Sequence, residues 1–500
     1  MHIVAIRPRS PARLGTYSEG LRWWGCRAFV APRLPALLAA IADRHQSVSR
    51  FSILDLEAGD AADFDGDADY ALIIAESRHI PSIRYLCGRF RARKVHTLLA
   101  GSYVSALPQR ADFVDTRLIG EVESAFEAFL SALDEGRPIP AEISAPTPVD
   151  PARLPLPKWE TLDLSSYLFG EIEVSRGSDH GPGGWRRMSD ERIPAEIDAL
   201  RAAGAGRIRL ETPGLWSKEA EARSLLELLS RRDKRHPQLS CTGGEELLNA
   251  GPPRLFAAAG IRRIELIVDP REGGIDSARL HRLRAPLQAL NAEGIHAVLH
   301  VAWPGKGLDE ETMALLTELP ATPLMESEWA EPGTPRYEAL EAEGRLLRGG
   351  RDAALRRDPL DAPNFTSADW DRREVKDALR AAARRLYAPE VIATRIRPLA
   401  RGDRLPLPEL RALIRMLAEA PRHRDEKRIE LTLRALLSLL KTRTSPLRWD
   451  RALDAFLENA ANRSLIERVV AGRELEHAVT PKTLKQTMLG LVAKAAARAA

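Results

Sequence analysis

Apolar residues in the first part of the chain alternate between short runs and helical spacing. The runs MHIVAI, FSILDLEA, DYALIIAES, KVHTLLAG and DFVDTRLIG predict strands. The stretches PRLPALLAAIADR, IPSIRYLCGRFRAR and EVESAFEAFLSALDEG repeat apolar residues at the spacing of a helix. Such alternation builds a parallel sheet with helices on both faces. We therefore expect an α/β domain, doubly wound and Rossmann-like, over residues 1–136.

Small and polar residues follow the predicted strands of this domain. The strand ends fall at residues 75–79, 101–105 and 120–123. Ligands of doubly wound sheets bind beyond the carboxyl ends of the strands. The sequence therefore predicts a ligand site along this edge.

The next segment, residues 137–168, is rich in proline. Seven prolines lie between Arg137 and Trp159. Proline lacks the backbone donor that a helix interior or a central strand requires. We expect an extended linker between two domains here.

A second alternation of strands and helices covers residues 169–345. Six strands are expected, in EIEVSRG, RIRLETPG, QLSCTGG, RIELIVDP, HAVLHVAWPG and PLMESEWAEPG, each followed by a helix-like stretch. Six such units in a row predict a partial (β/α)6 barrel. The chemistry of such barrels lies at the carboxyl ends of the strands.

The last part, residues 346–500, consists of amphipathic helical stretches. We expect a helical C-terminal domain that caps the barrel mouth. Positive charge gathers from Arg351 to Ala500, so that an acidic protein or a partner enzyme is a candidate for this region, beside the simpler interpretation of solvated helices.

Composition narrows the remaining classes. No apolar run is long enough to span a bilayer, and MHIVAIRPRSPARLG does not resemble a signal peptide. We expect a cytoplasmic protein with no membrane span and no nucleic-acid partner. The three cysteines, Cys26, Cys87 and Cys241, are too scattered for a disulfide framework or a local metal site.

Three stretches of the first part carry a resemblance that periodicity alone does not give. They are Asp69–Ile74, LLAGSYVSALPQRADFVDTRLIGEVESAF and LPLPKWETLDLSSY. Their order resembles the cobalamin-binding domain and linker of the cobalamin-dependent radical SAM proteins. In that family a Gly-Gly-Pro-His-like turn, a Gly-Glu-x-Glu turn and a Pro-x-Trp linker follow one another. The resemblance implies that residues 1–136 bind cobalamin.

The second alternation continues this resemblance. EVSRGS, RRMSDERIPAEIDAL, FAAAGIRRIELIVD, WPGKGLDEETM and EPGTPRYEALEAEG resemble, in order, the SRGC strand, its helix, the AGxxxIxxGxES strand, the GxPGET turn and the PGTPLY segment of the family. The resemblance extends over residues 1–345. It implies a radical-SAM-like barrel.

The cluster motif of the family, CxxxCxxC, is missing. Its positions hold Ser178, Pro182 and Trp185. A four-iron cluster requires thiolate ligands, and proline and tryptophan offer no side-chain ligand at all. We therefore expect no iron–sulfur cluster and no reductive cleavage of S-adenosylmethionine. Binding of S-adenosylmethionine stays open, with Arg176, Arg186 or Arg187 as a candidate partner for its carboxylate, beside the simpler interpretation that these arginines lie on the solvated start of a helix.

The resemblance also implies which residues contact cobalamin. Arg78 or His79 would lie nearest the cobalt, although a structural role for His79 is the simpler interpretation. Small residues suit the turns, because the backbone must approach a bulky ligand. The implied cobalamin contacts are Ser77, Arg78, His79, Gly101, Ser102, Tyr103, Gly120 and Glu121.

Two functions from different classes fit these observations. In the first, the chain is a methyl or alkyl transferase that uses cobalamin without radicals on a small-molecule or peptide substrate, in a specialised biosynthetic pathway such as one for a natural product. Each candidate helper is also a candidate structural carboxylate. These candidates, at the predicted strand ends, are Glu211, Asp269, Glu326 and Glu328.

In the second, the chain is a non-catalytic partner of a true radical SAM enzyme and binds cobalamin or substrate for it. The barrel mouth separates the two functions. A mouth lined by charged groups favours the enzyme, whereas a mouth plugged by Trp185, Trp303 or Trp329 favours the partner.

Overall fold

The structure is a computed structural model. It describes residues 1–10, 15–16, 20–59, 67–76, 79–145, 148–179, 183–232, 237–268, 275–303, 307–330, 334–347, 360, 362–399, 416 and 449–470. Three of the amphipathic stretches expected within residues 346–500 lie outside these residues, apart from Met416. They are LPELRALIRMLAEA (407–420), KRIELTLRALLSLLKT (427–442) and TPKTLKQTMLGLVAKAAARAA (480–500).

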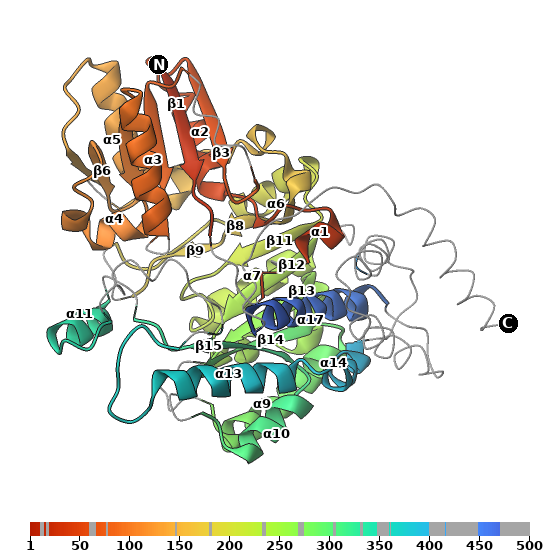
Figure 1. The fold of residues 1–500 in the computed structure, drawn as a ribbon. Coiled ribbons are helices and arrows are strands. Elements are labelled where there is room, and N and C mark those ends of the chain that lie inside the picture. Colours follow the sequence, from red (N-terminus) through yellow and green to blue (C-terminus); the bar gives the residue numbers. More distant parts are fainter. Residues whose placement is uncertain are drawn as a thin grey trace, which may run out of the picture.

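The first domain is a doubly wound α/β domain, as the sequence predicts. Its six strands are all parallel, in the order β3-β1-β4-β5-β6-β7. Helices α2 and α5 cover one face of the sheet, and α3 and α4 cover the other (Figure 1). The strands are β1 (His2–Arg7), β3 (Arg50–Asp55), β4 (Tyr70–Ile74), β5 (His96–Ala100), β6 (Thr116–Ile119) and β7 (Glu142–Ser144). The helices are α2 (Arg33–Ala42), α3 (Ile80–Ala92), α4 (Ser102–Ala106) and α5 (Val122–Asp134).

Strand β7 lies within the proline-rich segment that we expected to be a linker. It pairs with β6 at the edge of the sheet. Its three residues lie in a short stretch without proline, between Pro140 and Pro146. An edge position tolerates such a short strand, because only one side needs hydrogen-bonding partners.

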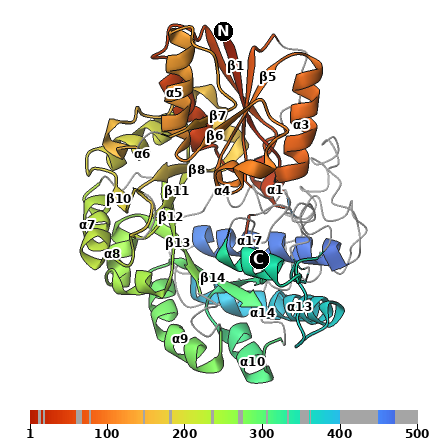
Figure 2. The same cartoon turned by 90° about the vertical axis from the view of Figure 1, so that its left-hand side faces the viewer.

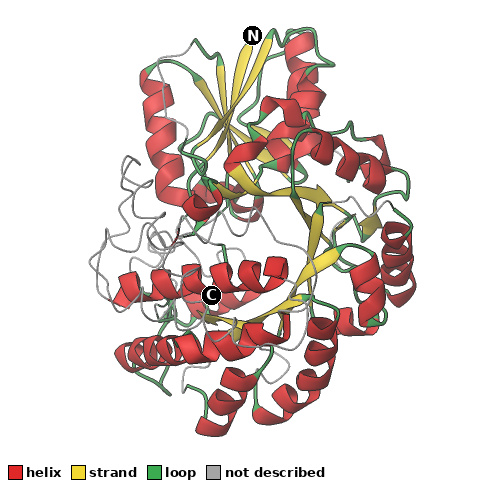
Figure 3. Ribbon diagram, turned by 90° about the vertical axis from the view of Figure 1, so that its right-hand side faces the viewer, coloured by secondary structure: helices red, strands yellow, loops and turns green. Residues whose placement is uncertain are grey.

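The second sheet is a curled half-barrel of seven parallel strands, in the order β15-β14-β13-β12-β11-β8-β2 (Figure 2). Helices cover its convex face (Figure 3). The six predicted strands are present as β8 (Tyr167–Glu173), β11 (Arg207–Glu211), β12 (Gln238–Gly243), β13 (Ile261–Ile267), β14 (His296–Trp303) and β15 (Thr322–Ser327). The covering helices are α6 (Arg192–Ala202), α7 (Glu219–Ser230), α8 (Pro253–Ala258), α9 (Ser277–Ala292) and α10 (Glu310–Glu318).

The seventh strand, β2 (Ala28–Val30), comes from the first 136 residues. It pairs with β8 and so extends the barrel sheet by one edge strand. The short helix α1 (Leu21–Trp24) precedes it, and Gly15 N donates to Asn462 Oδ1 over 2.8 Å. The first domain is therefore not one continuous stretch of residues 1–136, because β2 belongs to the barrel sheet.

Three helices of the C-terminal region are described, namely α13 (Arg372–Leu386), α14 (Pro389–Ile396) and α17 (Trp449–Val470). Helix α17 lies on the concave side of the half-barrel (Figures 2 and 3). Its Asp454 pairs with Arg207 at 3.3 Å, and its Asn459 donates to Thr322 Oγ1 over 2.8 Å. Arg207 and Thr322 begin their strands, so α17 closes the amino end of the barrel. The expectation that this region caps the mouth is wrong for α17.

The open edge of the half-barrel at β15 is covered by α13. The Tyr387 hydroxyl, just after α13, donates to the carbonyl of Pro323 over 2.6 Å. Among the described residues, no helix is both long and apolar enough to cross a membrane.

Candidate functional site

The carboxyl edge of the first sheet lies against the barrel strand β8. At the start of β8, the Tyr167 hydroxyl donates to Asp55 Oδ2, at the end of β3, over 2.6 Å. Beyond the end of β8, Arg176 Nη2 donates to Glu123 Oε1, in the first turn of α5, over 2.6 Å. Strand β8 therefore runs along the carboxyl edge of the first sheet from β3 to α5 (Figure 1). The predicted ligand edge thus faces the barrel.

Gly101 forms the tightest turn on this edge. Its φ is +112°, and a Cβ there would overlap the carbonyl oxygen of Ala75, so only glycine fits. Ser102 follows as an exposed residue at the start of α4, while Tyr103 is buried. The ends of β4 and β5 therefore meet through bare backbone, and the contact of Gly101 with cobalamin stays a prediction.

The turn after β6 holds Gly120 and Glu121. Gly120 has a φ of +89°, and its N–H donates to Ser105 Oγ over 3.0 Å. Glu121 accepts hydrogen bonds from Val149 N at 2.5 Å and from Arg186 Nη1 at 3.2 Å. Burial raises the pKa of Glu121, but these bonds outweigh burial and hold the pKa below its usual value. Glu121 thus joins the two domains.

His79 is buried, with an exposed fraction of 4%. Its Nδ1 accepts from the backbone N–H of Glu76 at 3.0 Å, so the proton of the neutral ring lies on Nε2, 3.0 Å from Ser10 Oγ. Neither nitrogen keeps a lone pair for cobalt. The structure therefore argues against His79 as an axial ligand. Ser77 and Arg78 lie outside the described residues.

The positions of the missing cluster motif lie in a loop between two short antiparallel strands, β9 (Ser175–Arg176) and β10 (Arg186–Arg187). Ser178 is exposed. Trp185 Nε1 donates to the carbonyl of Pro213 over 2.9 Å, and Lys218 Nζ lies 4.9 Å from the ring centre. Pro182 lies outside the described residues.

The three cysteines belong to different elements. Cys87 is buried in α3, Cys241 is buried in β12, and Cys26 precedes β2. Burial raises the pKa of Cys87 to about 12 and also raises the pKa of Cys241. In the described part of the chain, no three His, Cys, Asp or Glu side chains are grouped to hold a metal ion.

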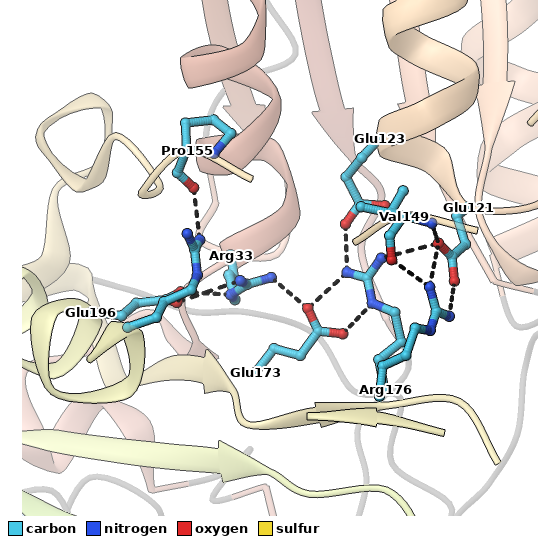
Figure 4. Close-up of polar contacts among 10 residues, drawn as sticks. Arg33, Glu121, Glu123, Val149, Pro155, Glu173, Arg176 and Glu196 are labelled. Carbon is cyan, nitrogen blue, oxygen red and sulfur yellow. Dashed lines mark hydrogen bonds and ion pairs between the residues drawn. The ribbon is translucent and has the colours of Figure 1, made fainter. Parts of the chain in front are cut away.

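Charged residues form a continuous chain of ion pairs beside this loop (Figure 4). Arg33 pairs with Glu196 at 2.7 Å and with Glu173 at 3.0 Å. Arg176 donates to Glu173 Oε2 over 2.7 Å, in addition to its bond with Glu123. We call the residues Arg33, Glu121, Glu123, Glu173, Arg176, Arg186 and Glu196 the ion-pair chain.

Arg176 lies at the centre of the ion-pair chain. Burial opposes its charge, but Glu173 and Glu123 outweigh burial and raise its pKa. A third carboxylate, that of Glu121, lies 3.7 Å from Arg176 Nη1. The predicted role of Arg176 as partner of the S-adenosylmethionine carboxylate stays a prediction, because a ligand there must compete with three carboxylates of the protein.

A second group of charged residues lines the concave face of the half-barrel. Arg207 contacts α17 on this face, so Arg209 and Glu211 of the same strand face the interior as well. On β13, Arg263 pairs with Glu458 of α17 at 2.7 Å. Arg263 also pairs with Glu265, which accepts from His300 at 3.0 Å. Burial opposes the charge of Glu265, but Arg263 and His300 hold its pKa well below the usual value.

Of the predicted catalytic candidates, Glu211 lies in this interior. It pairs with Arg209 at 2.8 Å and keeps an exposed fraction of 38%. Glu326, on β15, is half-buried. Glu328 follows β15 and pairs with Arg336 at 2.8 Å. Asp269 lies outside the described residues. The structure brings Glu211 toward the interior charges and gives Glu328 a structural partner.

Sequence reasoning missed Glu171, on β8. It lies in register with Arg209 and therefore on the same interior face. Burial and repulsion from Glu211 raise its pKa to about 8. Charged and apolar residues alternate in EIE, RIRLE and RIEL, which a strand with one polar face requires, and this alternation was the available signal.

Comparison with known proteins supports the expected family. No family model matches the chain. The chain is 24% identical over 391 residues to the hopanoid C-2 methylase of Rhodopseudomonas palustris (strain TIE-1), and the match covers 69% of the chain and 71% of the methylase.

Two solved structures of TsrM from Kitasatospora setae, a radical S-adenosylmethionine methyltransferase, are also similar. The one with tryptophan substrate and aza-SAM has a TM-score of 0.45 at 15% identity, and covers 66% of this chain and 73% of its own. The one with cobalamin and a [4Fe-4S] cluster has a TM-score of 0.46 at 15% identity, and covers 68% and 78%. With its ordered motifs and its match to the methylase, the chain is a divergent relative of the cobalamin-dependent radical SAM methyltransferases.

Proposed function

We propose that the chain binds cobalamin between the carboxyl edge of its first sheet and the barrel, and that it transfers a methyl or alkyl group without an iron–sulfur cluster. The substrate is a small molecule or a peptide. The observation that carries this proposal is the bare-backbone turn at Gly101, on an edge that faces the polar barrel interior through β8. When bound, cobalamin would supply the chemistry of a polar alkyl transfer, without free radicals.

The residues of the edge fit cobalamin in part. Gly101 and Gly120 keep two strand ends free of side chains, and Ser102 is exposed beside them. Glu121 and His79 are committed to other partners, so we assign them to the protein framework. Tyr103 is buried, and its hydroxyl lies 3.5 Å from the carbonyl of Arg110, so it supports the turn from below.

The cluster positions do not fit iron. Ser178 and Trp185 replace thiols, and Arg176 and Arg186 on either side are paired with carboxylates. We therefore derive no radical step. S-adenosylmethionine remains one possible alkyl donor for a polar transfer.

The barrel interior gives this chain groups that orient a substrate. Arg209 and Glu211 offer a half-buried charge pair, and His300 keeps an exposed fraction of 27% next to Glu265. Ile267, at the end of β13, is exposed to 48% and adds an apolar contact. A polar substrate with an apolar part suits this surface.

The test is retention of corrin. Protein purified without oxygen is mixed with hydroxocobalamin, passed through gel filtration, and measured for corrin absorption and iron. We expect corrin bands without iron. Ser102→Trp places bulk on the exposed turn and should abolish retention, whereas Ala220→Trp, on the exposed surface of α7, should not. Retained iron, or equal retention by both variants, contradicts the proposal.

The alternative of a non-catalytic partner is favoured by one observation. Trp329, after β15, packs against the apolar cluster of the first domain, and Arg110 of that domain pairs with Glu341 of α11 (Pro335–Ala342) at 3.0 Å. The two domains are thus tied on the α11 side as well as along β8. Corrin retention without alkyl transfer from any donor would establish this alternative.

A further inference from the structure

Near Glu171, at the junction of the two domains, every arginine already pairs with a carboxylate other than that of Glu171. Four charged groups surround it, namely Arg209 and Glu211 on β11, Arg33 on α2 and Arg7 at the end of β1. Each arginine already pairs with another carboxylate. Arg209 pairs with Glu211 at 2.8 Å, Arg33 with Glu196 at 2.7 Å, and Arg7 with Asp55 at 2.7 Å.

The position of Glu171 follows from its strand. It lies between Tyr167, which contacts the end of β3, and Glu173, which belongs to the ion-pair chain. Its side chain is half-buried on the concave face, in register with Arg209. Two nearby arginines are used elsewhere, because Arg33 Nη1 donates to Glu173 Oε2 over 3.0 Å and Arg209 pairs with Glu211. The carboxylate of Glu171 therefore lies where the cofactor edge meets the barrel interior, and none of the described residues donates a hydrogen bond to it.

We propose that Glu171 is a catalytic residue that accepts the proton of the substrate atom to which the methyl or alkyl group is transferred. This inference rests on the proposed function. The bond between that atom and hydrogen breaks, and the proton moves to a carboxylate oxygen of Glu171. The electron pair of the broken bond forms the new bond to the alkyl carbon. The bond between the alkyl group and its carrier breaks, and its electron pair stays with the carrier.

The surroundings prepare Glu171 for this role. A general base is most effective when its pKa lies near the working pH. Burial, followed by repulsion from Glu211, moves the pKa of Glu171 to about 8. A cationic group on the substrate would favour the ionised form of Glu171, because the nearby arginines pair with other carboxylates.

The protonation state is tested by infrared spectroscopy on the full chain. We expect the band of a protonated carboxyl at neutral pH, lost as the pH rises through about 8. Glu171→Gln should remove this band. Glu211→Gln removes the repelling charge and should shift the loss to lower pH. Glu227→Gln, on the exposed side of α7, should leave it unchanged. A band that persists in Glu171→Gln overturns the assignment.

The catalytic role is tested by single-turnover transfer with corrin-loaded protein across pH. Glu171→Gln should slow transfer on the order of 100-fold or more and remove its pH dependence, with corrin retention unchanged. A wild-type rate and pH profile in Glu171→Gln overturn the role. If wild-type protein retains corrin but transfers no alkyl group, the proposed transfer function fails, and the catalytic role of Glu171 fails with it. The infrared result then still reports the protonation state of Glu171.

Discussion

Arg176 Nη2 lies 2.6 Å from Glu123 Oε1, and this contact joins the hairpin after the first barrel strand to the first turn of α5. Both side chains are largely buried. The loop in which the related enzymes are expected to carry cluster ligands begins directly after Arg176. In this chain the same place serves contact between domains, through charges that satisfy one another.

We expect Arg176→Ala to destabilise the protein strongly, because it leaves the buried Glu123 without the cation it pairs with and removes one of the two arginines that pair with Glu173. Loss of one partner of a buried ion pair costs about 3–5 kcal/mol in free energy of unfolding. Urea denaturation measures this loss. Arg223→Ala is the matched control, since Arg223 pairs with an exposed Glu219 at 3.6 Å and should cost less than about 1 kcal/mol. If Arg176→Ala keeps wild-type stability and instead loses binding of S-adenosylmethionine, the role first inferred from sequence is correct.

Gly101→Ala should cost more stability than Gly204→Ala, although both glycines have a positive φ of similar size. The φ angles are +112° and +103°. A Cβ at Gly204 meets no atom within 4 Å, so only the backbone strain of about 1–2 kcal/mol is expected. A Cβ at Gly101 would overlap the carbonyl oxygen of Ala75 as well.

Thermal unfolding of the two glycine variants gives the comparison. Corrin retention, measured in the same preparations, should fall for Gly101→Ala and stay unchanged for Gly204→Ala. Equal stabilities would show that the ends of β4 and β5 are free to separate at this turn.

The order of the elements could be predicted from the sequence, because each strand and helix has its own periodicity. The pairing of β2 with β8 could not, since AFV is too short to show a period and its partner lies far along the chain. The position of α17 was also hidden. Its Asp454, Glu458 and Asn462 recur every fourth residue and mark a polar stripe. The sequence does not show that Arg207 and Arg263 lie opposite the first two and the backbone N–H of Gly15 opposite the third.

The site was predicted unevenly for a related reason. Gly101 is recognisable because a special backbone angle demands glycine. The sequence predicts Glu121 and Arg176 as ligand contacts, which stays untested, and in the structure both pair with charged residues of the other domain. Charges that pair between domains look like ligand contacts in a sequence, since the pattern does not show what they meet.

Glu458→Ala should be among the most destabilising changes in α17. Glu458 is fully buried and pairs with Arg263 at 2.7 Å, so its removal takes from the buried guanidinium of Arg263 its pairing carboxylate on α17. We expect a loss of about 3–5 kcal/mol. Glu467→Ala, on the same helix, removes a partly exposed i,i+4 pair with Arg463 and should cost less than about 0.5 kcal/mol. Similar urea midpoints for the two variants would mean that α17 does not hold the barrel closed.

His296 should make the folded state sensitive to mild acid. It is buried, its Nε2 lies 2.9 Å from Thr322 Oγ1, and burial followed by the charge of Arg263 lowers its pKa from 6.5 to about 3. The folded protein therefore keeps this ring neutral, whereas the unfolded chain binds a proton below its ordinary pKa. The contribution of His296 to the free energy of unfolding is complete above the pKa of histidine in the unfolded chain. It falls by about 1.4 kcal/mol per pH unit as the pH drops from there toward the pKa of His296 in the folded protein.

The measurement is the free energy of unfolding of wild type and His296→Gln between about pH 7 and pH 5. The difference between the two proteins isolates His296, because the opposite contribution of Glu171 is present in both. We expect the wild type to lose stability more steeply than the variant as the pH falls. His281→Gln, at an exposed position on α9, should follow the wild-type slope. Parallel slopes for wild type and His296→Gln would mean that the imidazole takes up its proton inside the folded barrel, where Glu458 Oε2 lies 3.4 Å from Nδ1.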